Sequence, residues 1–74
     1  MFEKFAELIC DYVEVEADQI NESSRFAEDL GFNSYDFMSM LGEAEEIFDV
    51  EFDEKEAASK KTVGEMIGYI EELK

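Results

Sequence analysis

The chain has 74 residues, of which 21 are acidic and six are basic, so its net charge is −15. This length allows one domain with one small core, and a hydrophobic share of 46% is too high for general disorder. The charge argues against nucleic acid or an anionic membrane as a partner, because both are bound by basic side chains. No apolar run approaches the roughly 18 residues of a spanning helix. We therefore expect a single cytoplasmic domain over residues 1–74 that does not insert into membranes.

The chain lacks the residues from which most active sites are built. It has one cysteine and no histidine, so it has no internal disulfide and no usual base to activate a nucleophile. A zinc site is not expected either, because zinc is held mainly by cysteine and histidine. These absences predict a protein without catalysis of its own and without a specific metal site.

Apolar spacing predicts a first helix over residues 2–12, followed by a long loop over residues 13–33. The apolar stripe of this helix consists of Phe2, Phe5, Leu8, Ile9 and Tyr12. The loop segment shows no sustained period. Its expected anchors in the core are Val15, Ile20, Phe26 and Leu30. A loop of this length in so small a domain is unusual and is often functional.

The second helix is predicted over residues 34–48, because Asn33 is a good N-cap and Asp36 stands where the helix dipole favours an acid. Its expected core face consists of Phe37, Met40, Leu41, Ala44 and Phe48. The opposite face consists of Tyr35, Met38, Gly42, Glu45 and Glu46, with Ser39 beside them. Periodicity alone does not decide whether this face docks a protein or is merely solvated.

The sequence pattern of the remaining residues predicts two more helical segments. A turn or short helix is expected over residues 53–59. Thr62 and Glu65 form a Thr-x-x-Glu capping box that opens the last helix. The expected buried stripe of that helix consists of Val63, Met66, Ile67, Ile70 and Leu73. The predicted fold is therefore all-α, a small helical bundle with a long loop between helices 1 and 2 and a short third helix.

Ser34 is the one candidate for a reactive position. It follows a turn at Gly31 and stands in the first turn of the second helix. Since no base is available, another enzyme would have to act on it. A phosphate attached there would meet free backbone N–H groups and the positive end of the helix dipole. The alternative is that Ser34 only helps to cap the helix.

Three segments of the chain resemble the acyl carrier protein family. Residues 28–34 read Glu-Asp-Leu-Gly-Phe-Asn-Ser, and residues 45–51 read Glu-Glu-Ile-Phe-Asp-Val-Glu. The third segment is the last helix, with Thr62-Val63 at its start and a Tyr-Ile pair at residues 69–70. The similarity covers nearly the whole chain, and the length, the acidity and the order of the helices agree with it.

The resemblance implies a four-helix carrier with 4′-phosphopantetheine esterified to Ser34. A magnesium-dependent phosphopantetheinyl transferase would take this group from coenzyme A. The carrier, expected to be a monomer, would then pass acyl thioesters among acyl-transferring, condensing and modifying enzymes with basic docking patches. Fatty acid biosynthesis is the default pathway. The residues expected at partner contacts are Asn33, Tyr35, Asp36, Met38, Ser39, Gly42, Glu45 and Glu46. The residues expected around a sheltered acyl chain are Phe26, Met40, Leu41, Ala44 and Ile67.

Several positions depart from the family pattern. Asn33 stands in place of the usual aspartate, Tyr35 in place of leucine and Gly42 in place of a large apolar residue. All three lie at the serine or on the expected docking face. They keep open a carrier dedicated to a specialised pathway, such as polyketide, aminoacyl or peptidyl, or lipid-modifying chemistry.

Two rival interpretations come from other functional classes. An acidic protein-interaction module with an unmodified serine remains open. A calcium-binding loop beginning at Asp49 is excluded, because its sixth and twelfth positions would need glycine and glutamate but hold Glu54 and Lys60.

Overall fold

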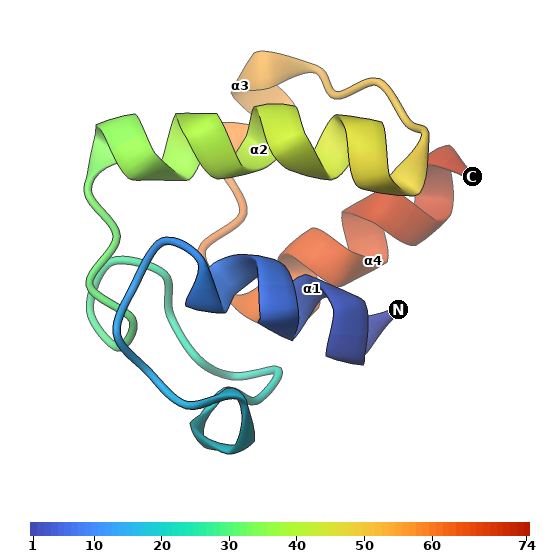
Figure 1. Ribbon diagram of the computed structural model, residues 1–74. Coiled ribbons are helices and arrows are strands. Elements are labelled where there is room, and N and C mark those ends of the chain that lie inside the picture. Colours follow the sequence, from blue (N-terminus) through green and yellow to red (C-terminus); the bar gives the residue numbers. More distant parts are fainter.

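The computed structural model describes residues 1–74 and contains four α-helices and no strand (Figure 1). The helices are α1 (Phe2–Cys10), α2 (Ser34–Phe48), α3 (Glu54–Ala58) and α4 (Val63–Leu73), and a 3-10 turn, η1, spans Ala17–Gln19. In the view of Figure 1, α2 runs along the top with α3 beside it, while α1 and α4 lie below. The predicted all-α fold with a long first loop and a short third helix is confirmed. None of the helices is long and apolar enough to cross a membrane.

A single buried cluster joins α1, α2, α4 and the long loop. Its largest fully buried side chains are Phe5, Ile9, Met40, Met66, Ile70 and Val63. The loop contributes Ile20, Phe26 and Leu30, as predicted, whereas Val15 is only half-buried. The loop is therefore part of the core, and it covers one end of the bundle (Figure 1).

The first helix is shorter than predicted. It ends at Cys10, because the N–H groups of the next two residues turn back to carbonyls only three positions away, from Asp11 to Leu8 at 3.1 Å and from Tyr12 to Ile9 at 2.9 Å. The Tyr12 ring still packs on the protein, with its centroid 6.2 Å from that of Phe32.

Tyr12 also fastens the end of α1 to α2. Its hydroxyl donates a hydrogen bond of 2.6 Å to the carboxylate of Glu43, and this bond, with lesser help from burial, raises the pKa of Tyr12 to about 12. Because the pKa is raised in the folded state, this contribution to stability is complete below the ordinary value of 10.0 and is lost as the pH rises towards 12.

We expect Tyr12 to stay mostly protonated at pH 11 and to be more ionised there in the variant Glu43→Ala, which removes the acceptor of the hydrogen bond. Tyrosine ring carbon-13 NMR measures this directly, because the shift of the ring carbon that bears the hydroxyl reports ionisation residue by residue. Equal titration of Tyr12 in both proteins would show that the hydrogen bond to Glu43 does not control it.

The last helix buries a residue that was not included in its expected buried stripe. Tyr69 is buried, while Ile67 is half-buried and Leu73 is 41% exposed. The Tyr69 ring packs at 5.6 Å from Phe52, and its hydroxyl accepts a hydrogen bond of 2.9 Å from the N–H of Asp53. Burial of Tyr69 therefore follows from its contacts with the linker before α3, which helical spacing alone does not reveal.

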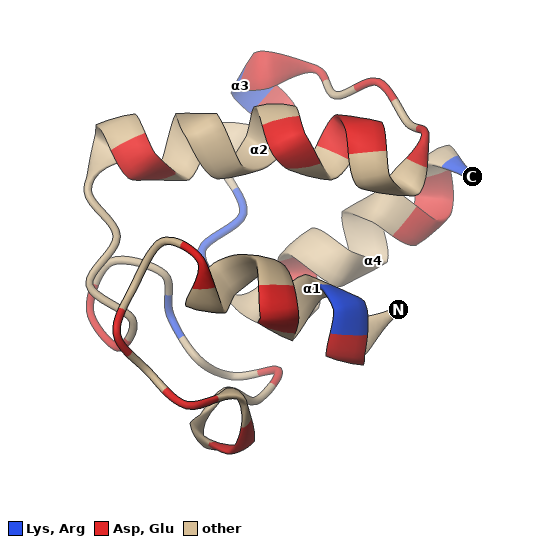
Figure 2. Cartoon of the chain, in the orientation of Figure 1, with Lys and Arg blue, Asp and Glu red and all other residues tan.

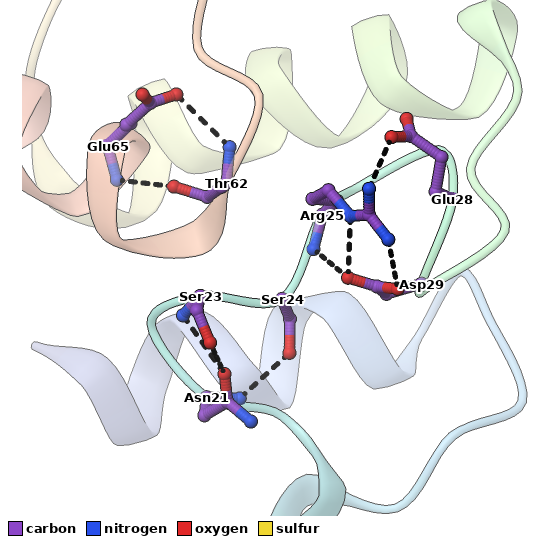
Figure 3. Close-up of polar contacts among 8 residues, drawn as sticks. All are labelled: Asn21, Ser23, Ser24, Arg25, Glu28, Asp29, Thr62 and Glu65. Atoms are coloured by element: carbon purple, nitrogen blue, oxygen red, sulfur yellow. Dashed lines mark hydrogen bonds and ion pairs between the residues drawn. The ribbon is translucent and has the colours of Figure 1, made fainter.

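Figure 3 shows polar contacts within the long loop and, separately, at the start of α4. Arg25 forms ion pairs with Glu28 and Asp29, each at 3.1 Å, and its side chain holds the pKa of Asp29 below the usual value. The N–H of Phe26 donates to the carbonyl of Lys61 at 3.0 Å. At Thr62 the predicted capping box is present, as both of its hydrogen bonds with Glu65 are made. The bond from Phe26 to Lys61 holds the loop next to the linker between α3 and α4.

Gly64 in α4 lies against the backbone of the loop. A Cβ atom there would stand 3.0 Å from the carbonyl oxygen of Glu22, whereas a Cβ at Gly68 would meet nothing within 4 Å. We expect Gly64→Ala to lower the free energy of unfolding by about 1 kcal/mol, because the clash outweighs the gain in helix propensity. Gly68→Ala is the matched control and should raise it by about 0.5–1 kcal/mol. Urea unfolding of both variants tests this, and an equal gain would contradict the close approach.

Candidate functional site

Ser34 is presented by a tight turn and a capped helix end. Gly31 has φ of +79°, a left-handed conformation that glycine adopts without strain, and the N–H of Phe32 donates to the carbonyl of Phe26 at 2.9 Å. The side-chain oxygen of Asn33 then accepts a hydrogen bond of 2.7 Å from the N–H of Asp36. Asn33 is thus the N-cap of α2, and it leaves Ser34 as the first helical residue.

The Ser34 side chain is free to react with an external group. The residue is exposed, and its hydroxyl forms no hydrogen bond with another group of the chain. With no histidine in the chain, the hydroxyl has no conventional base beside it. The site therefore presents an accessible hydroxyl at the start of α2.

A pocket of about 210 Å³ lies beside Ser34. Its apolar wall is formed by Phe26, Ala27, Phe32, Phe37 and Ala58. Its polar rim is formed by Glu28, Asn33, Ser34, Lys60 and Lys61. Phe37, predicted to be a core residue, is half-buried because its ring stands in this wall. The sequence analysis did not predict this pocket, although two adjacent lysines in so acidic a chain were a visible signal.

The expected docking residues share one side of α2 but differ in exposure. Tyr35 is 79% exposed and Met38 is 38% exposed. Gly42 and Glu46 are also exposed, while Asp36 and Ser39 are half-buried. An unpartnered aromatic residue on this side therefore stands next to Ser34.

Glu45 accepts a hydrogen bond from the backbone, whereas its neighbour Glu46 does not. Its carboxylate accepts a hydrogen bond of 2.7 Å from the N–H of Phe52, and the residue is half-buried. Glu45 therefore holds the linker between α2 and α3 against α2. Ile47, which was not among the expected docking residues, is 38% exposed beside Glu46.

The candidates for a sheltered acyl chain do not line one common cavity. Phe26 lines the pocket beside Ser34, and Leu41 lines a separate groove of about 300 Å³ between α2 and the linker before α3. Met40 and Ala44 are fully buried in the core, and Ile67 is half-buried. An acyl chain among these five residues would require the core to open.

The charges around the site are unevenly distributed. Figure 2 shows acidic positions along α2, α3 and the long loop, and a basic segment in the linker between α3 and α4. That segment holds Lys60 and Lys61, which belong to the pocket beside Ser34. Two basic residues of an otherwise acidic chain thus line the same pocket as the serine.

Comparison with known proteins gives the family. A family model described as phosphopantetheine attachment site matches residues 3–70. A curated acyl carrier protein of Clostridium perfringens is 38% identical over 72 residues, which cover 97% of this chain and 95% of that protein. The chain belongs to the acyl carrier protein family. An acyl carrier protein of Sulfurovum sp. is 34% identical over 73 residues, covering 99% of this chain and 97% of that protein.

Solved structures agree with this family. The structure of an acyl carrier protein from Enterococcus faecalis matches with a TM-score of 0.85 and 29% identity, covering 99% of this chain and 92% of that one. Membership implies a covalently attached 4′-phosphopantetheine, and hence interaction with a phosphopantetheinyl transferase and acyl-handling enzymes. The exposed Ser34 hydroxyl and the two lysines of the adjoining pocket fit a group that is joined through a phosphate.

Proposed function

We propose that Ser34 carries 4′-phosphopantetheine on its Oγ atom and that the protein delivers acyl groups to the enzymes of fatty acid biosynthesis. The observation that carries this proposal is the unbonded, exposed hydroxyl of Ser34 at the start of α2, inside the segment matched by the family model. When bound, the group supplies a terminal thiol that holds the acyl chain as a thioester. The protein itself acts as a non-catalytic, monomeric carrier in the cytoplasm.

The chain positions the Ser34 hydroxyl and leaves it accessible to the transferase, which supplies the catalysis. Asn33 caps α2 through its side-chain oxygen, so the first helical turn is formed before any group is attached. The Ser34 hydroxyl gives up its proton to a base of the transferase, because this chain places no histidine there. Asparagine at position 33 keeps the cap and removes a negative charge beside the incoming phosphate.

Partner enzymes meet α2 through its exposed acidic and apolar side chains. Tyr35 and Met38 supply apolar contact area next to Ser34, and Glu46 supplies an uncommitted negative charge further along the helix. Basic patches on the partners complement the net charge of −15, which speeds encounter.

We expect Glu46→Lys to raise the KM of a partner enzyme for the loaded carrier roughly twofold to fivefold at low salt, and to weaken the salt dependence of that KM. Glu71→Lys on α4 makes the same change of charge away from α2 and should leave KM almost unchanged. Steady-state kinetics at two salt concentrations measure both effects. Equal KM values for the two variants would show that only net charge matters. Glu45 is unsuitable for this test, since its reversal also breaks the bond to the N–H of Phe52.

A carrier dedicated to a specialised pathway is the second candidate. It is favoured by the exposed Tyr35 and Gly42, which stand on the α2 surface where the family pattern has leucine and a large apolar residue. A docking surface altered at these two positions would select different partner enzymes.

Acyl loading tests the proposed function. The phosphopantetheinylated protein is incubated with malonyl-coenzyme A and a malonyl transacylase of fatty acid synthesis, and its intact mass is followed. A gain of one malonyl group that hydroxylamine removes supports a thioester carrier of that pathway. No gain on protein that already carries the arm would overturn the assignment to fatty acid biosynthesis and favour the specialised carrier.

A further inference from the structure

Two of the six basic residues of the chain line the same pocket as Ser34. Lys60 and Lys61 come from the linker between α3 and α4. This linker is held to the long loop by the hydrogen bond that the N–H of Phe26 donates to the carbonyl of Lys61. Five of the ten residues that line this pocket are apolar. Such a combination, an apolar recess with a few cationic groups, suits an organic group that carries an anion.

Neither lysine forms an ion pair with a carboxylate, although the chain has 21 acidic residues, and both act on Glu65 only at longer range, where they help to lower its pKa. Both ion pairs of the protein belong to Arg25, and one of them engages Glu28, the only acid on the pocket rim. The ammonium group of Lys60 lies 5.2 Å from the centre of the Tyr69 ring, which is a cation–π contact and not an ion pair. The two lysines that line the pocket with Ser34 are therefore not committed to an ion pair and can bind an anion.

The size of the pocket and the chemistry of attachment indicate which anion this is. A volume of about 210 Å³ is smaller than the roughly 300 Å³ at which sites for whole drug-sized ligands begin, so only part of a long group fits. In a group esterified to Ser34 Oγ, the phosphate is the anion nearest the serine, while the acyl thioester lies at the far end of a flexible arm.

We propose that Lys60 and Lys61 bind the phosphodiester that joins 4′-phosphopantetheine to Ser34, and that the first part of the arm lies against the pocket wall formed by Phe37 and Ala58. The inference rests on the proposed attachment at Ser34. Phosphate and ammonium form charge-assisted hydrogen bonds, and the apolar wall suits the branched, methyl-bearing part of the arm that follows the phosphate. The lysines thus restrain the base of the arm and leave its thiol end to move.

Isotope-filtered NMR of the loaded protein tests this inference. The protein is labelled with carbon-13 and nitrogen-15, and the unlabelled arm is added by a transferase, with intact mass confirming its presence. In the parent protein we expect nuclear Overhauser contacts from the methyl protons of the arm to Phe37 and Ala58. The double variant Lys60→Gln, Lys61→Gln should weaken them roughly threefold to tenfold, as expected for the loss of two exposed charge pairs. Lys55→Gln removes one charge from α3 outside this pocket and should leave them unchanged.

The outcomes separate this inference from the proposed function. An arm present by mass but without contacts to Phe37 and Ala58 in the parent, or with contacts equally strong in the double variant, would overturn the inference and leave attachment at Ser34 intact. Failure of Ser34 to accept the arm at all would overturn the proposed function and this inference with it. Amide spectra of the double variant show whether its fold is kept, which matters because Lys60 contacts the ring of the core residue Tyr69.

Discussion

The variant Ser34→Ala is expected to accept no phosphopantetheine, while its helical circular dichroism and melting temperature stay close to those of the parent. Loading should be lost entirely, because the oxygen that forms the ester is removed. Stability should change by no more than about 0.5 kcal/mol, since the side chain is exposed and the cap of α2 is provided by Asn33. Intact mass after incubation with coenzyme A, magnesium and a transferase measures the first effect, and thermal melting measures the second.

Ser39→Ala is the matched control for this prediction. It makes the same chemical change five residues further along α2, at a half-buried position away from the helix start. We expect it to be loaded like the parent. Loading of Ser34→Ala would contradict attachment at this residue, and loss of loading in both variants would point to damage of the recognition surface rather than of the acceptor oxygen.

The variant Phe26→Ala should lose about 3–5 kcal/mol of unfolding free energy, the usual cost of removing a buried phenylalanine. Phe26 is 4% exposed, and its ring centroid lies 6.2 Å from that of Phe5, 5.8 Å from that of Phe32 and 5.1 Å from that of Phe37. For a domain of 74 residues the total stability is expected to be about 4–11 kcal/mol. Loss of this ring would therefore leave the protein marginally folded.

Chemical denaturation with circular dichroism checks the effect of Phe26→Ala. Tyr35→Ala is its control, because it also removes an aromatic ring but from a position that is 79% exposed. We expect a change of at most about 0.5 kcal/mol in that control. Similar losses in the two variants would mean that the loop is not packed into the core in the way that the Phe26 contacts indicate.

The features that depend on local spacing could be predicted from the sequence. The limits of α2 were predicted at both ends, because Asn33 is a strong capping residue and the apolar period continues to Phe48. The capping box of Thr62 and Glu65 was predicted for the same reason, since both partners lie within one helical turn. Local chemistry therefore accounts for the position of Ser34 at a helix start.

The features that depend on distant contacts could not be predicted in this way. The burial of Tyr69 follows from Phe52 and Asp53 on another segment, and the bond from Phe52 to the Glu45 carboxylate joins α2 to the following linker. The pocket beside Ser34 likewise combines the long loop, α2 and the linker before α4. Helical periodicity describes one element at a time, so it does not predict tertiary contacts between separate elements.

The most direct test of the account is to locate the prosthetic group by tandem mass spectrometry. Protein that has been treated with coenzyme A, magnesium and a broad-specificity phosphopantetheinyl transferase is digested, and the modified peptide is sequenced. The account predicts one phosphopantetheine on Ser34 and none on Ser23, Ser24, Ser39 or Ser59. Attachment at any of those other serines would contradict the assigned site, and a chain that stays unmodified would contradict its role as a carrier.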